Sequence, residues 1–370
     1  MTFAVLIAIE VYQTNDSVKA LILASGPLGL IGSLFLVPLV LALRRAATRV
    51  ASEISLVGAL GFAIAAMSEG SLIIYIGGIS LGLFSASVVI PLQTHWLRHN
   101  YPVESRGRLV GAGMAVRATA SIIFSLGAGI LLEFEIAGYP LVLAAFSIAG
   151  LVASVAMSQV PQPAMRPRER AGIFQAMVWI KRDKTFRWML ISMMVMGAAV
   201  LTTNALRVEY VANERYGLAF SETRVALLTS TIPALTRLGT TVFWGWLFDR
   251  INVIVMRLIM NGIFAIAIFL YFWGTQFWII ACGAFVFGIA RGGGEILWNL
   301  WVTKLSPHDH VADYMSVHTF FTGIRGVVAP FLGFWAIASL GPRGTTMFAL
   351  VCIVIAGLAL VRFIPRSGNR

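Results

Sequence analysis

Charge and cysteine are both scarce in this chain. Charged residues make up 12% of its 370 residues, about half of the 25% that is usual in a soluble domain. It has two cysteines, Cys282 and Cys352, and each lies inside an apolar stretch. Two isolated cysteines of this kind predict neither a disulfide framework nor a metal site. The composition therefore excludes an ordinary soluble domain.

Signals of enzyme chemistry are also missing from the sequence. The three glycines between Arg291 and Glu295 are not followed by the Gly-Lys-Ser/Thr that completes a phosphate loop. We find no candidate nucleophile with a base, no metal-ligand spacing and no nucleic-acid-binding module. We therefore expect no enzyme, no cofactor, no metal and no nucleic-acid partner, and attribute the net charge of +12 mainly to loops beside a membrane.

Long apolar runs dominate what is present. Hydrophobic residues make up 58% of the chain, and the mean hydropathy is +0.85. A membrane-spanning helix needs about 20 mostly apolar residues. Phe3 to Ile9 is apolar but too short to span. The sequence predicts an all-α polytopic membrane protein with eleven full transmembrane helices and a partial first, near residues 19–43, 52–69, 71–97, 107–132, 138–158, 186–210, 222–248, 253–273, 276–304, 311–339 and 343–363.

One polar stretch divides the hydrophobic mass. It runs from Gln159 to Arg187 and contains Pro161, Pro163 and Pro167, which interrupt any continuous helix. We predict an N-terminal helical bundle at 1–158, a linker at 159–185 and a C-terminal six-helix bundle at 186–370.

Basic loop residues alternate strongly between the two sides of the predicted membrane. Under the positive-inside rule, this places the linker and the C-terminus in the cytoplasm of an inner (plasma) membrane. We assign Arg250 and Arg257 to a cytoplasmic loop and Arg207 to the opposite side.

The two halves of the chain repeat at a constant offset. Trp96 and Trp301 are 205 positions apart, as are Ser25 and Ser230. Parallel repeats of this kind build transporters whose halves rock around a site at mid-membrane. The offset places most of the partner of span 186–210 before Met1, so we expect the first helix to be truncated in this sequence.

Gly245-Trp-Leu-Phe-Asp249-Arg250, followed by Arg257, resembles the Gly-x-Leu-x-Asp-Arg signature of the major facilitator superfamily. The repeat places this motif after the second helix of its half, as in that family. The resemblance implies a two-bundle fold with a parallel pseudo-twofold repeat and alternating access. It also implies a cytoplasmic latch, for which Gly245, Asp249, Arg250 and Asp313 are the candidates.

Four arginines lie inside predicted spans: Arg117, Arg237, Arg291 and Arg325. A charge at the bilayer centre costs at least about 2.5–3.5 kcal/mol, so such residues usually face a protein interior or a water-filled path. Glu295 is the acidic residue at comparable depth, four positions after Arg291 and therefore on the same helix face. We expect these arginines to face a shared crevice, with Arg117 the nearest to the cytoplasmic surface.

The excess of arginine favours an anionic substrate, because the guanidinium fork suits carboxylate or phosphate. Glu295 is the candidate for proton coupling, although a permanent ion pair with Arg291 is the competing interpretation. The candidate substrate-binding or cavity residues are Arg291, Glu295, Asn299, Arg237, Arg325, His318, Thr322, Asn204, Thr203 and Gln93.

The sequence thus predicts a monomeric secondary active transporter in the lipid bilayer. It would move a small organic solute, anionic rather than neutral, by alternating access, with H+ as a candidate co-substrate. Two alternatives remain open. One is a drug or metabolite efflux pump, and the other is a non-transporting membrane sensor or assembly factor on the same scaffold.

Overall fold

The computed structural model describes residues 2–90, 92, 96, 100, 106–161, 177–306 and 311–363. Helices account for the regular structure in these ranges, and no strand occurs within them. The predicted all-α class is therefore confirmed. The chain divides into two compact units, one built mainly from residues 1–170 and the other mainly from residues 171–370. The predicted boundaries at 158 and 186 remain predictions.

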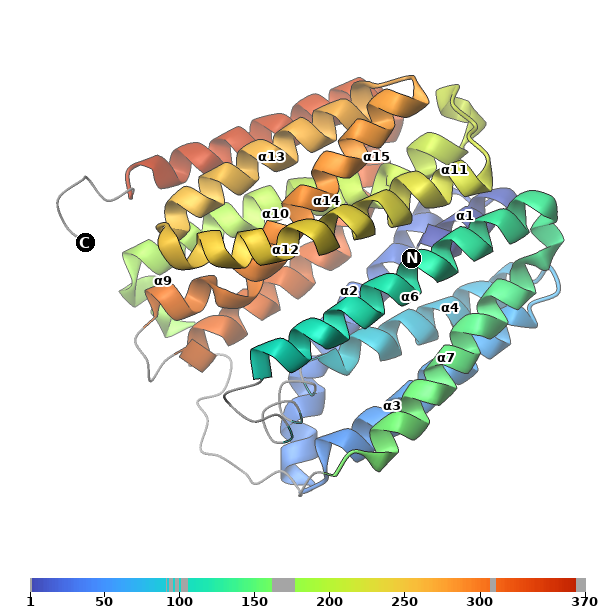
Figure 1. The fold of residues 1–370 in the computed structure, drawn as a ribbon, viewed down its shortest axis with the longest axis horizontal. Coiled ribbons are helices and arrows are strands. Elements are labelled where there is room, and N and C mark those ends of the chain that lie inside the picture. Colours follow the sequence, from blue (N-terminus) through green and yellow to red (C-terminus); the bar gives the residue numbers. More distant parts are fainter. Residues whose placement is uncertain are drawn as a thin grey trace. The chain divides into compact units, whose positions relative to one another are not determined.

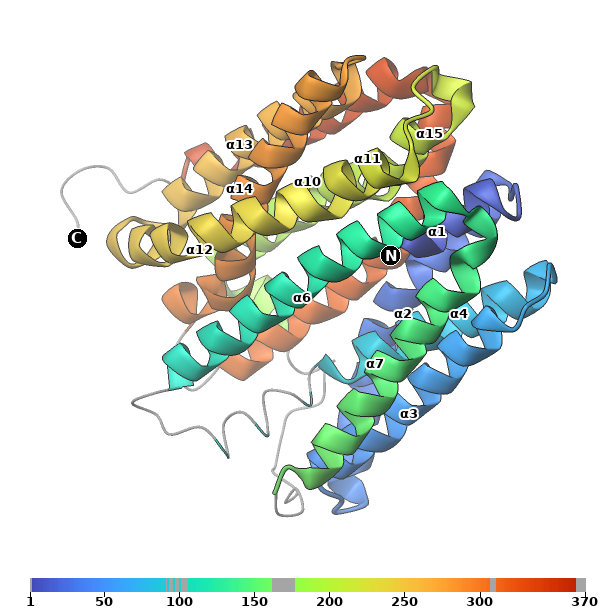
Figure 2. The same ribbon diagram turned by 45° about the vertical axis from the view of Figure 1, so that its right-hand side comes forward.

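The first unit contains α1 (Thr2–Glu10), α2 (Asp16–Ala42), α3 (Ala47–Ala66), α4 (Leu72–Val88), α6 (Arg106–Phe134), the short helix η1 (Ile136–Gly138) and α7 (Tyr139–Gln159). Helices α3 and α7 lie side by side (Figures 1 and 2). Ser52 and Ser154 join them reciprocally, since each hydroxyl donates to the other residue's carbonyl at 2.8 Å. Small side chains let these backbones approach, as is common between membrane helices.

The second unit begins with α9 (Val178–Arg182), α10 (Lys184–Ala212) and the short helix η2 (Glu214–Tyr216). A continuous helical segment follows, made of α11 (Glu222–Ala226), the π-helical turn η3 (Leu227–Thr231) and α12 (Ile232–Arg250). The unit is completed by α13 (Val253–Trp273), α14 (Phe277–Leu305) and most of α15 (Val311–Val361).

Local chemistry explains where several of these helices begin and bend. Asp183 caps α10 by accepting a hydrogen bond from the backbone N–H of Phe186 at 2.9 Å, and Asn252 caps α13 in the same way through Ile254 at 2.8 Å. Gly341 has φ 68° inside α15, a backbone conformation that glycine adopts readily. This position separates the predicted spans 311–339 and 343–363.

Seven helical stretches in the described ranges are long and apolar enough to cross a membrane, and one of them, Val317–Val361, contains the Gly341 kink. The chain is therefore a multi-pass membrane protein, while the predicted count of eleven spans and a partial first stays a prediction.

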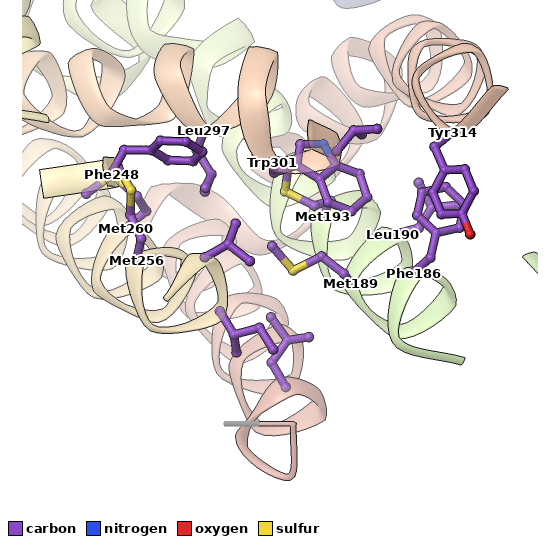
Figure 3. Packing of buried hydrophobic residues seen from close by; sticks show 14 of the residues in the cluster. Phe186, Met189, Leu190, Met193, Phe248, Met256, Met260, Leu297, Trp301 and Tyr314 are labelled. Atoms are coloured by element: carbon purple, nitrogen blue, oxygen red, sulfur yellow. The ribbon is translucent and has the colours of Figure 1, made fainter. Parts of the chain in front are cut away.

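A large apolar cluster fills the interior of the second unit (Figure 3). Phe186 stacks on Trp301 with ring centroids 5.5 Å apart, and it contacts Tyr314 at 4.2 Å. The cluster continues through Met189 and Met193 toward Met256 and Met260. Methionine fills irregular gaps between helices well, so helices α10, α12, α13, α14 and α15 share one core.

Candidate functional site

An ion pair crosses from α12 to α14 within the second unit. Arg237 Nη1 donates to Glu295 Oε1 at 3.1 Å, and the two side chains are 21% and 31% exposed. Both residues were predicted site residues, and the structure brings them together. The sequence offered Arg291 as the ion-pair partner of Glu295. In the structure the Glu295 carboxylate bonds instead to Arg237, which lies 58 positions away.

Arg291 lies beside this pair without joining it. It is half-buried on α14, and Glu295 and Arg237 both act on it electrostatically. Within the described part of the chain, its guanidinium has neither a hydrogen-bond partner nor an ion-pair partner. Arg291 is therefore the cation of this group whose hydrogen-bonding capacity is unused.

Glycines allow α12 and α14 to approach closely at this point. A Cβ on Gly288 would lie 2.7 Å from the Pro233 carbonyl oxygen, and one on Gly292 would lie 2.9 Å from Thr240 Oγ1. Trp244 Nε1 also donates to the Ile289 carbonyl at 2.9 Å. The glycine-rich stretch thus serves helix packing, and this packing sets the distance between Arg237 and Glu295.

The threonines on α12 are occupied by their own helix. Thr236, Thr240 and Thr241 donate to the carbonyls of Ile232, Thr236 and Arg237 at 2.9, 2.8 and 2.6 Å. The hydroxyl of Thr203 on α10 likewise donates to the carbonyls of Ala199 and Val200. The hydroxyl protons of these four threonines are therefore already engaged within their own helices.

Arg207 is a buried residue that sequence reasoning misplaced. We expected it in a loop, but it is 5% exposed on α10, and its guanidinium lies over the rings of Tyr271 and Phe287 at 4.7 and 4.4 Å. It donates to the Leu228 carbonyl in the π-helical turn, where the wider helix leaves carbonyls accessible. In a sequence, a basic residue near the end of an apolar run looks the same whether it lies in a loop or in the last turns of a buried helix.

Arg325, His318 and Thr322 all lie on α15. Arg325 donates to the Met193 carbonyl on α10, and His318 is fully buried against Trp298 and Trp301. The single shared crevice that we expected for the arginines stays a prediction.

Arg117 lies on α6 in the first unit, and its side chain is exposed. The expectation that it faces a crevice stays a prediction.

The remaining candidates are less informative. Asn204 is half-buried on α10. Asn299 lies in α14 and Asp313 in α15, but their side chains are outside the described part of the structure. Gln93 is outside the described residues altogether.

Three of the predicted latch residues, Gly245, Asp249 and Arg250, lie in the last turns of α12. Asp249 and Arg250 are exposed, and the Arg250 guanidinium lies 4.1 Å from the Trp246 ring centroid. Lys304, which sequence reasoning did not select, donates to the carbonyls of Phe248 and Ile251. It thereby satisfies the last carbonyls of α12 with a cation, which the helix dipole favours.

Comparison with known proteins agrees with this architecture. Residues 209–370 match the model of the Major Facilitator Superfamily. A curated relative, described as an uncharacterized MFS-type transporter, YxiO of Bacillus subtilis, is 23% identical over 130 residues. The alignment covers 34% of this chain and 30% of that protein.

Solved structures extend the likeness to the whole chain. A mutant of the nucleoside transporter NupG aligns with a TM-score of 0.79 at 12% identity, over 98% of this chain and 95% of that one. The xylose transporter XylE from E. coli, in a partially occluded inward-open conformation, aligns with a TM-score of 0.70 at 15% identity, over 100% and 95%. Residues 209–370 therefore resemble the Major Facilitator Superfamily, and the chain as a whole has the fold of these two solved transporters.

Proposed function

We propose that this protein is a secondary transporter that moves a small organic anion across the plasma membrane, with Arg291 as its anchor. The observation that carries the proposal is the half-buried Arg291 guanidinium, which has no partner in the described part of the chain although it lies in a candidate membrane span. A cation in that position is costly unless something compensates its charge, and a substrate anion supplies that compensation.

The local charge balance supports an anion over a neutral solute. Arg237, Arg291 and Glu295 together carry a formal charge of about +1 when all three are ionised. The planar guanidinium of Arg291 can hold a carboxylate or phosphate through two parallel hydrogen bonds. A neutral substrate would leave this charge uncompensated.

The Arg237–Glu295 ion pair supplies a route for proton coupling. Protonation of Glu295 removes the negative charge that holds Arg237, so both arginines become available to the substrate. Anion affinity should then rise as pH falls, and the anion and the proton should move together. In this proposal the linker and the C-terminus are cytoplasmic, and the protein acts as a monomer.

Thermal stability with a ligand panel tests the substrate class. Carboxylates, sugar phosphates and neutral sugars are added to the purified protein, and the midpoint of unfolding is measured for wild type and Arg291→Gln. We expect an anion to stabilise wild type and to lose at least about tenfold in affinity in the variant. Arg224→Gln, which changes an exposed arginine, is the control and should respond as wild type does.

Uptake into proteoliposomes then separates transport from mere binding. Uptake of the stabilising anion that increases with an inward proton gradient supports the coupled transporter. Stabilisation by bulky apolar compounds, with tolerance of Arg291→Gln, would instead indicate a drug or metabolite efflux pump. Ligand binding without flux would indicate a sensor or assembly factor, and either result would overturn the proposal.

A further inference from the structure

Arg257 is a buried cation that the proposed transport site does not use. We expected it in a cytoplasmic loop, but it lies in α13 and is 5% exposed. Its Nε is fully buried without a hydrogen-bond partner, and no hydrogen bond or ion pair to the guanidinium occurs within the described residues. A buried guanidinium without a counter-charge would cost several kcal/mol, so natural proteins pair such groups.

A second arginine, Arg325 on α15, acts electrostatically on Arg257. Arg325 gives one N–H to the Met193 carbonyl, while its Nε is buried without a partner. A carbonyl oxygen carries no net charge, so the bond to Met193 leaves the positive charge of Arg325 uncompensated.

Around these two arginines lie polar atoms that also lack partners. His318 is 0% exposed, and both of its ring nitrogens are unpaired; Arg325 and Arg257 act on it electrostatically. Trp301, whose ring centroid is 5.3 Å from that of His318, has a buried unpaired Nε1–H. Thr322 lies one turn after His318 on α15, and its hydroxyl is also buried and unpaired.

Donors exceed acceptors in this group, which we call the Arg257 cluster: Arg257, His318, Trp301, Thr322 and Arg325. Arginine and tryptophan can only donate hydrogen bonds, whereas the histidine and the threonine can each also accept. The missing partner must therefore be rich in acceptors and negatively charged. Water would accept hydrogen bonds, but it would leave two positive charges uncompensated inside the unit.

We propose that the Arg257 cluster binds a small inorganic anion, with chloride as the probe, and that this anion stabilises the packing of α13 and α15. The cluster is distinct from the proposed transport site. Trp301 lies ten residues after Arg291 on α14, which is about 15 Å along a helix. The described residues that act electrostatically on Arg257 and His318 are arginines and not Glu295.

The first test measures the unfolding midpoint of the purified full chain in sodium chloride, sodium bromide and sodium gluconate at equal ionic strength. Gluconate is too large for a buried site between helices. We expect chloride and bromide to raise the midpoint saturably, by on the order of 3–8 °C over gluconate. Equal midpoints in all three salts would overturn the proposal.

The matched variants are Arg257→Met and Arg291→Gln. Arg257→Met keeps a long side chain but removes the charge, so the halide dependence should disappear, whereas Arg291→Gln should retain it. Halide dependence that survives in Arg257→Met would contradict the assignment. If Arg291→Gln retains the halide dependence, anion binding at the Arg257 cluster is tested independently of the proposed transport function.

A second measurement avoids the variants, in case Arg257→Met does not fold. Crystals of the wild-type protein grown in bromide are examined for anomalous scattering at the bromine edge. A peak within about 3.5 Å of the Arg257 guanidinium, in contact with His318 or Trp301, supports the proposal. Bromide peaks only at the protein surface would overturn it.

Discussion

Arg237 on α12 donates through Nη1 to Glu295 on α14 at 3.1 Å. The two residues are far apart in sequence and are joined by the close packing of α12 on α14. This bond ties the proposed proton carrier to one arginine and leaves the other, Arg291, available.

A double-mutant cycle tests the energetic coupling of this pair. Arg237→Gln, Glu295→Gln and the double variant are compared by denaturant unfolding in detergent. The coupling energy should be about 0.5–3 kcal/mol, because the side chains are in direct contact and less than a third exposed. A coupling energy near zero would mean that the contact contributes nothing, as in many exposed ion pairs.

Gly288→Ala tests the helix packing that positions the pair. The new Cβ would lie 2.7 Å from the Pro233 carbonyl oxygen and 2.7 Å from Thr236 Cβ. Since the carbonyl oxygen belongs to a helix backbone, α12 must move, at a cost of about 1–3 kcal/mol. Gly239→Ala on α12 is the control, because nothing lies within 4 Å of its new Cβ, and it should not destabilise the protein. Equal stability of the two variants would contradict the packing role.

Gly197→Ala should displace the Arg325 guanidinium. The new Cβ would collide with Nη1 and Cζ of Arg325, so the hydrogen bond to the Met193 carbonyl would be lost. We expect a loss of about 1–3 kcal/mol in the free energy of unfolding. Arg325→Met removes the obstacle, so the same glycine change should cost less in that background. Gly262→Ala, which has open space around its Cβ, serves as the neutral control.

Lys304→Met should weaken the end of α12 beside the predicted latch. The ammonium group contacts the Phe248 and Ile251 carbonyls, and its loss leaves terminal carbonyls without a cation. The expected cost is about 0.5–2 kcal/mol. Hydrogen exchange should increase at residues 247–251 and remain unchanged in α10. Unaltered exchange in the variant would show that solvent satisfies these carbonyls equally well.

The Tyr314 phenol should make the stability of the fold depend on pH in the alkaline range. Burial raises the pKa of Tyr314 to about 12, helped by its hydrogen bond to the Asp183 carboxylate at 3.0 Å and by that carboxylate's charge. Because the folded-state pKa is higher than the unfolded value near 10, the phenol stabilises the fold fully below pH 10. This contribution is lost as pH rises toward 12.

Tyr314→Phe should therefore flatten the decline in unfolding midpoint between pH 9 and pH 11, and lower the midpoint at pH 7 by the loss of one hydrogen bond, about 1 kcal/mol. Tyr12→Phe is the comparison variant in the first unit, because burial also raises the pKa of Tyr12 to about 12. An unchanged alkaline profile in Tyr314→Phe would assign the decline to other groups.

The apolar runs by themselves placed most helices within a few residues. The predicted span 186–210 corresponds to α10 at Lys184–Ala212, and 253–273 corresponds to α13 at Val253–Trp273. Membrane helices satisfy their own backbone hydrogen bonds, so local hydropathy is enough to locate them. The signature around Asp249 is a local motif, so the sequence alone could suggest the family whose model residues 209–370 match.

Only the tertiary structure decided which charges meet. Spacing on one helix placed Glu295 with Arg291, yet the carboxylate bonds to Arg237 across the helix interface. The count of basic loop residues placed Arg207 and Arg257 at the membrane surfaces, although both fall inside predicted spans, and the structure buries both within helices. The partner of a long charged side chain depends on which helix faces it and at what distance, and those quantities arise from packing between segments far apart in sequence.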